Sequence, residues 1–147
     1  MRAITLWQPW ASAIALGLKT YETRGWSTKV RGPILIHAAK RWTPAEREFC
    51  SNMASFFNRP DLENPSLGAI VAMADITSVH STEDIRDNLS ETELAFGNYE
   101  DNRFAWGLEN IRAFEEPIPY KGGQGFFKVP SDIVLNAAVK KPLNIGL

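Results

Sequence analysis

Hydrophobic and polar residues near the start of the chain first follow a helical spacing. Pro9 suits the first turn of a helix, because its missing N–H needs no partner there. The apolar residues that then fall on one helical face are Trp10, Ala13, Ile14 and Gly17. The spacing predicts a helix that ends near residues 17–19.

The residues after this helix alternate as in a β-strand. Tyr21 and Thr23 would point to one face of an extended chain, and Glu22 and Arg24 to the other. A second strand is predicted over residues 30–39, VRGPILIHAA, which is rich in strand-forming side chains. Two short strands should therefore follow the first helix closely.

The later part of the chain predicts one long helix and several strands. Thr43 and Glu46 form a capping box with Pro44 at the first helical position, so a helix should run to about Phe57. A loop is expected over 58–66 and a β-rich run over 68–79. The acidic segment 81–101 should hold one or two short helices, with Ser90-x-x-Glu93 as a further capping signal. The closing strands are expected over 104–114 and 125–129, joined by a turn-rich stretch over 115–124. Short strands with few helices and Gly/Pro-rich joints favour an α+β fold around a small β-barrel over a parallel sheet.

Charge is distributed unevenly along these 147 residues, a length that suits one domain. Residues 1–41 hold seven Lys or Arg and one carboxylate, residues 42–102 hold three and twelve, and residues 103–147 hold six and four. A basic, Trp-rich N-terminal third in a chain of net charge −1 indicates a binder of something anionic and planar. We expect one basic face, made mainly by Lys19, Arg24, Lys29, Arg31 and Lys40.

Three charged residues could converge on one point. On a strand Glu22 and Arg24 share a face, and Lys19 reaches in from the end of the preceding helix. A carboxylate between two cations would stay ionised and could accept from an exocyclic amine or activate water, while the cations could hold phosphate or an oxyanion. The alternative is a structural ion-pair network that fixes the first helix to the first strand.

The Trp and His residues also allow two interpretations. Trp26 and Trp42 follow charged segments and are the better candidates for exposed platforms that stack a base. Trp10 on an apolar helical face is most simply interpreted as core, and Trp7 is open to the same interpretation. His37 lies in an apolar strand, which is more typical of a hydrogen-bonded core histidine than of a catalytic base.

Several classes of protein are disfavoured by the composition. The only cysteine, Cys50, lies in a predicted helix, and no Cys/His cluster has metal-ligand spacing, so we expect neither a metal nor another cofactor. No apolar run approaches the roughly 20 residues that span a bilayer, and the start of the chain lacks the features of a signal peptide. A cytoplasmic protein without a membrane partner is expected.

The residues discussed above resemble the signature of the ASCH family, whose domains are similar to the PUA fold. The motifs stand here as Gln8-Pro9-Trp10, the array Gly17-x-Lys19-x-x-Glu22-x-Arg24, then Trp26, and a strand from Arg31-Gly32 to Ile36-His37-Ala38. Residues 68–72, 104–108 and 125–130 are similar to the later barrel strands of that family, and residues 104–108 include Trp106. The likeness covers roughly residues 3–130.

This resemblance implies a PUA-like β-barrel of five to six strands with helices packed around it. It implies an ASCH domain over residues 1–130 and a C-terminal extension over 131–147. Members of the family are associated with single-stranded RNA or DNA, some are reported as ribonucleases, and a shorter group as acetylcytidine amidohydrolases that use a Lys, a Thr and a Glu. Lys19 matches that lysine, but Glu22 stands where the threonine would fall, so that mechanism does not carry over.

Three functional hypotheses follow. The first is a binder of single-stranded RNA, DNA or a nucleotide, with a ligand site formed by Trp10, Lys19, Glu22, Arg24, Trp26, Lys40 and Trp106. The second is a metal-independent enzyme, a ribonuclease or nucleoside amidohydrolase, in which Lys19 and Glu22 are catalytic. The third is a protein-interaction domain that uses the acidic segment around residues 80–101.

Overall fold

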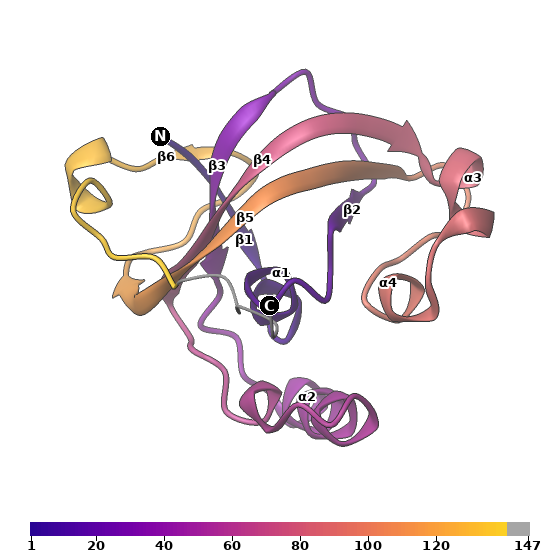
Figure 1. Cartoon of the computed structure of the whole chain (residues 1–147), viewed down its shortest axis with the longest axis horizontal. Helices are drawn as coiled ribbons and strands as arrows, with labels where there is room; N and C mark the ends of the chain where they lie inside the picture. The colour runs from indigo at the N-terminus through magenta and orange to yellow at the C-terminus, as the bar shows by residue number, and fades with distance from the viewer. Residues whose placement is uncertain (141–147) are drawn as a thin grey trace, which may run out of the picture.

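The computed structural model describes residues 1–140 of the chain, and its centre is one curved sheet (Figure 1). The strands are β1 (Arg2–Leu6), β2 (Tyr21–Arg24), β3 (Gly32–Ala38), β4 (Ala69–Ser81), β5 (Phe104–Pro119) and β6 (Phe127–Lys128). The helices are α1 (Trp10–Ala15), α2 (Pro44–Phe56), α3 (Thr82–Ile85) and α4 (Glu91–Ala95), with 3₁₀ turns at Pro60–Leu62, Arg86–Asn88 and Ser131–Ile133.

The six strands form a mixed sheet in the order β2-β5-β4-β3-β1-β6. The β1–β3 pair is parallel, and the other neighbouring strands are antiparallel. Although β2 and β6 lie at opposite edges of the sheet, Trp26 after β2 contacts Phe126 before β6, with ring centroids 5.8 Å apart. The sheet therefore curls into a half-barrel, and the expectation of a small PUA-like α+β barrel is confirmed.

The main core fills the concave side of this sheet. Ile4, Ile36, Ile76 and Trp106 come from four different strands, and each is at most 1% exposed. Ile14 of α1 belongs to the same buried cluster. Because burial of apolar side chains is the main favourable term in folding, this cluster fixes α1 beneath the sheet. Figure 1 shows α1 in that central place, with α2 farther out and α4 beside β2.

Most of the predicted elements are present, and one strand is longer than expected. The capping box of Thr43 and Glu46 is formed at the start of α2, as predicted. Strand β5 continues to Pro119, through a stretch that the sequence predicted as a turn. Pro117 and Pro119 are tolerated in this strand because β2 pairs only with residues 104–107. The later part of β5 therefore does not have to donate backbone N–H groups to β2.

The described part of the expected C-terminal extension packs against the sheet. Val134 is 7% exposed and lies in a second core cluster with Ala3 and Phe114. The backbone N–H of Glu115 donates to the carbonyl of Ala138, which continues pairing along β5. Residues 141–147 of that extension lie outside the described part of the chain.

Candidate functional site

Lys19, Glu22 and Arg24 converge at the start of β2, as the spacing predicted. Glu22 Oε1 lies 3.6 Å from Lys19 Nζ, and Glu22 Oε2 lies 2.8 Å from both Nε and Nη2 of Arg24. The chain turns back after α1 at Gly17, whose φ of +75° is a conformation that glycine adopts without steric cost. The N–H groups of Leu18 and Lys19 then donate to the carbonyl of Ala13, which sets Lys19 beside the strand.

The same cations also hold the surrounding backbone. Lys19 Nζ donates to the carbonyl of Phe96 at 2.8 Å, and Arg24 Nη2 donates to the carbonyl of Thr5 at 3.0 Å. Lys19 is 1% exposed and Glu22 is 6% exposed. Burial lowers the pKa of Lys19 below that of a free lysine, while the carboxylates of Glu22 and Glu93 oppose this shift. The charged cluster therefore stabilises the surrounding backbone through hydrogen bonds, in addition to presenting charged groups.

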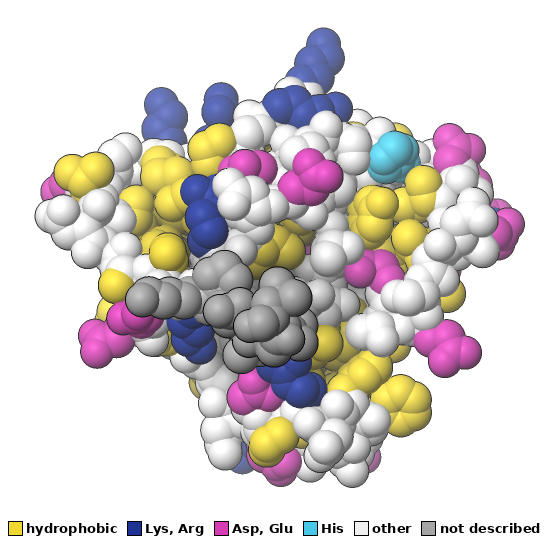
Figure 2. Space-filling model, in the orientation of Figure 1, with side chains coloured by type: hydrophobic (Ala, Val, Ile, Leu, Met, Phe, Trp, Pro, Cys, Tyr) yellow, Lys and Arg dark blue, Asp and Glu magenta, His cyan; other side chains and the backbone are white. Residues whose placement is uncertain are grey.

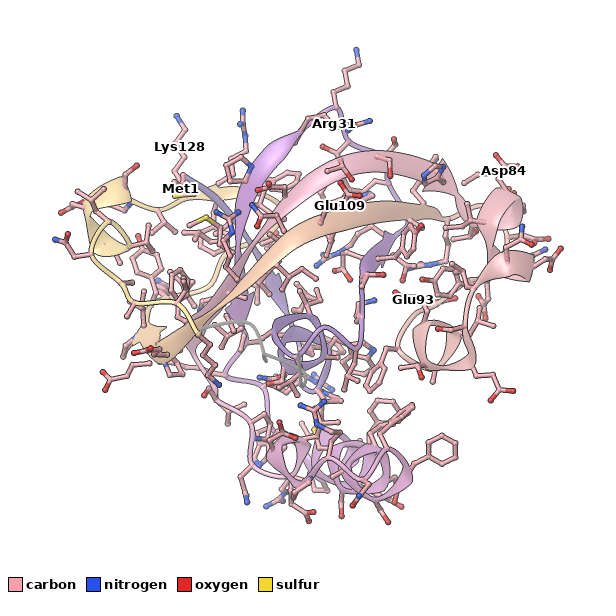
Figure 3. The ribbon with its side chains drawn as sticks, in the orientation of Figure 1. Met1, Arg31, Asp84, Glu93, Glu109 and Lys128 are labelled. Atoms are coloured by element: carbon pink, nitrogen blue, oxygen red, sulfur yellow. The ribbon has the colours of Figure 1, made fainter. Side chains whose placement is uncertain are left out.

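Glu93 fixes the segment that follows α4 against β2. Its carboxylate accepts hydrogen bonds from the backbone N–H groups of Thr20 and Tyr21, at 2.9–3.0 Å, and from the hydroxyl of Thr20. Figure 3 shows Glu93 between α4 and β2. Ser90 caps the helix by accepting from the N–H of Glu93, as its sequence signal predicted. This contact brings Phe96 and the residues after it to the charged cluster.

A pocket of about 620 Å³ lies over the cluster. Its lining comes from five places in the sequence: Thr5, Leu6, Trp7 and Trp10; Lys19; Glu22, Thr23 and Arg24; Ala95, Phe96, Gly97 and Asn98; and Arg103. Three cations and one carboxylate border it, so the pocket favours an anion. The acidic segment supplies one wall of the pocket through residues 95–98 and leaves the pocket open.

The aromatic residues differ from expectation. Trp7 is 52% exposed and borders the pocket, and Trp10, stacked on Phe49 at 5.1 Å, borders it too. Trp106 is 0% exposed, because it faces the core of the half-barrel, where it stacks on Phe126. The prediction that Trp106 stacks a ligand is therefore wrong.

Trp26 and Trp42, the two platforms expected from the sequence, both lie outside the pocket lining, and Trp42 is half-buried. Trp26 is 40% exposed, and its ring packs edge-on against Trp106, with centroids 4.8 Å apart. Its edge-on contact with Phe126 joins the two edges of the half-barrel. Trp7 and Trp26 thus exchange their expected roles. Trp7, expected in the core, borders the pocket, and Trp26, expected as a stacking platform, supports the fold.

His37 is buried between β1 and a later loop. It is 2% exposed, its Nε2 lies 2.7 Å from the carbonyl of Tyr120, and its Nδ1 lies 3.0 Å from the hydroxyl of Thr5. The carbonyl can only accept, so Nε2 carries the proton and Nδ1 accepts from Thr5. Burial lowers the pKa of His37. The residue is a hydrogen-bonded core histidine and does not line the pocket.

The prediction of one basic face is wrong. Arg31 precedes β3 and Lys40 follows it, and a seven-residue strand separates its ends by roughly 23 Å. Lys29, Arg31 and Lys40 are exposed and absent from the pocket lining, and Lys40 lies along Gly68 instead. Figure 3 shows Arg31 projecting from the rim of the molecule, away from Glu93, and Figure 2 shows other Lys and Arg side chains along that rim.

The sequence reasoning missed part of the site. Arg103 borders the pocket and is held by hydrogen bonds from its Nε to the carbonyl of Asn98 and from its Nη2 to that of Thr23. Asn98 and Gly97 also border it. Their only sequence signal was the acidic helix with its Ser90-x-x-Glu93 cap, which did not indicate where that helix packs.

None of the helices within residues 1–140 has the length and hydropathy needed to cross a bilayer. Over the same residues, no group of three His, Cys, Asp or Glu side chains could hold a metal ion.

Comparisons with known proteins agree with this fold. The chain is 25% identical over 134 residues to activating signal cointegrator 1 of Homo sapiens and of Mus musculus, a match that covers 88% of this chain and 22% of each relative. It therefore spans about a fifth of the length of those relatives.

Solved structures with a similar fold include the ASCH protein of Zymomonas mobilis. Its TM-score is 0.58 at 16% sequence identity, and the match covers 93% of this chain and 95% of that one. A point mutant of the same protein gives the same TM-score and identity, with 93% and 98% covered. The family model of the ASCH domain matches residues 4–118 of the chain. The protein thus belongs to the ASCH family, which is associated with RNA binding.

Proposed function

We propose that the pocket binds single-stranded nucleic acid or a nucleotide. The observation that carries this proposal is the placement of Lys19, Arg24 and Arg103 around one carboxylate, Glu22, in a pocket that Trp7 also borders. An anionic, planar ligand needs these two kinds of contact together. Family membership supports the proposal, because ASCH domains are associated with RNA binding.

The cations keep donors for a phosphate. Within the described part of the chain, the hydrogen bonds of Arg24 and Arg103 use Nε and Nη2 of each side chain and leave both Nη1 groups free. Lys19 has three N–H donors, of which one is used by the carbonyl of Phe96. Charge-assisted bonds to phosphate are about twice as strong as neutral ones.

Glu22 can supply the polar contact to a base. Its Oε1 is 3.6 Å from Lys19 Nζ, which is too long for a hydrogen bond, so this oxygen can still accept. An exocyclic amine of adenine, cytosine or guanine is a suitable donor. The carboxylate would then discriminate against a base edge that presents only a carbonyl there, since two acceptors repel.

An enzyme is the second candidate, and one observation favours it. Lys19 is almost completely buried beside Glu22, with its pKa lowered, and such a pair can stabilise an oxyanion and activate water. Such an enzyme would hydrolyse RNA or a modified nucleoside without a metal. His37 could serve as the acid of such an enzyme only if it opened into the pocket, and it is not in the pocket lining, so the binding proposal takes precedence.

Binding of a short single-stranded oligonucleotide at low salt tests the proposal. Arg24→Gln should weaken binding by about tenfold or more, because it removes a charged phosphate donor from the pocket. Arg31→Gln is the matched control, since it removes the same charge from outside the pocket, and it should bind like the parent. Equal losses in both variants would show non-specific binding and would overturn the proposal. Product formation from RNA or an acylated nucleoside, abolished by Glu22→Gln, would favour the enzyme.

A further inference from the structure

Trp7 is an exposed indole held in place from one side. It borders the pocket with 52% of its surface exposed, and the guanidinium of Arg41 lies over its ring, 4.2 Å from the centroid. Arg41 itself does not line the pocket. Arg41 therefore covers one face of the indole, and the exposed part of the Trp7 side chain remains available to a ligand.

Arg41 is fixed in turn. Its Nε donates to Oε1 of Glu46, the buried carboxylate of the capping box that starts α2. Arg41 thus links the indole of Trp7 to the first turn of α2. A cation over an aromatic ring stabilises this arrangement, and a preformed platform reduces the entropy lost when a ligand is ordered on it.

The pocket is suited in size to one small ligand. Pockets for single small molecules are typically about 300–1,000 Å³, and this one measures about 620 Å³. Its lining differs in chemistry: Trp7 follows β1 and lies against Arg41, whereas Arg24 ends β2 and Arg103 immediately precedes β5. A ligand with an aromatic ring at one end and an anionic group at the other matches both parts of the lining.

We infer that the pocket takes a single nucleotide unit, whose base stacks on the exposed indole of Trp7 while its phosphate binds Arg24 and Arg103. This inference rests on the proposed function. In a strand, one nucleotide would enter the pocket and its neighbours would remain outside. Recognition by stacking tolerates every base, because each base has a π-face, so Trp7 provides affinity and leaves base preference to groups such as Glu22.

The test compares nucleoside 5′-monophosphates with ribose 5-phosphate, which carries the phosphate but has no base. Trp7→Ala should weaken binding of the nucleotides by at least about fivefold, the lower end of measured stacking contributions, and should leave binding of ribose 5-phosphate unchanged. Trp7→Phe, which retains a ring, should give an intermediate loss. Phe56→Ala is the control, because Phe56 is an exposed aromatic residue at the end of α2 and outside the pocket lining.

The same variants measured with a six-nucleotide strand test the number of bases. If one base enters the pocket, Trp7→Ala costs the same factor for the strand as for the mononucleotide. A factor that grows with strand length would overturn the single-unit inference. Nucleotide binding unchanged in Trp7→Ala but lost in Arg24→Gln would overturn the role of Trp7 alone, whereas a parent protein that binds no nucleotide or strand would overturn the proposed function as well.

Discussion

Glu22 links the stability of the domain to its pocket. It is the carboxylate beside a lysine that is 1% exposed, and removing one partner of a buried ion pair leaves an uncompensated charge. We predict that Glu22→Gln lowers the free energy of unfolding by about 3 kcal/mol. Denaturant unfolding measures it, with the exposed Glu91→Gln as control. An unchanged midpoint would mean that Lys19 does not depend on Glu22 for its charge balance.

His37 should make stability sensitive to mild acid. Burial lowers its pKa in the folded protein below the unfolded value of about 6.5, so between these two pKa values the unfolded chain binds more protons. Its contribution is therefore complete above pH 6.5 and is lost as the pH falls through the folded pKa. Thermal unfolding between pH 8 and 5 should show a smaller decrease for His37→Gln than for the parent. Parallel curves would contradict this.

Among elements, α4 depends on one carboxylate for its position. Glu93 accepts from two backbone N–H groups at the start of β2 and from the Thr20 hydroxyl. In Glu93→Gln the side-chain NH₂ group would face backbone N–H groups that need an acceptor. We therefore predict that the free energy of unfolding falls by about 1–3 kcal/mol and that amide exchange at Phe96–Asn98 becomes faster. Glu91→Gln, exposed on the same helix, should change neither. Exchange measured by NMR would contradict the prediction if only Thr20 and Tyr21 responded.

Local patterns predicted most of the elements but not their partners. Alternation identified β2, and the capping boxes identified α2 and α4, because these signals depend on residues close in sequence. The length of β5 depends on pairing with β4 and on an edge that accepts prolines, which is tertiary information. The same limit affected the tryptophans: exposure of Trp7 and burial of Trp106 follow from how the sheet curls.

Across the whole molecule, the pocket is assembled from distant segments. The array of Lys19, Glu22 and Arg24 was predictable, since strand geometry alone places two of these side chains on one face. Arg103 and Asn98 join them only because β2 pairs with β5 and Glu93 holds α4 against β2. The excess of basic residues in segment 1–41 did not predict one basic face, because residues close in sequence can lie far apart in the fold. Arg31 and Lys40, for example, lie at the two ends of one strand.

Nucleotide binding in the pocket is tested most directly by an NMR map of the five Trp indole N–H signals during titration with a nucleoside 5′-monophosphate. Trp7 and Trp10 border the pocket, whereas Trp26 and Trp106 pack at the closure of the half-barrel. We predict saturable shifts at Trp7 and Trp10, together with shifts of the backbone signals of Thr23, Arg24 and Gly97. Shifts confined to Trp26, or to the rim near Arg31 and Lys128, would contradict this prediction.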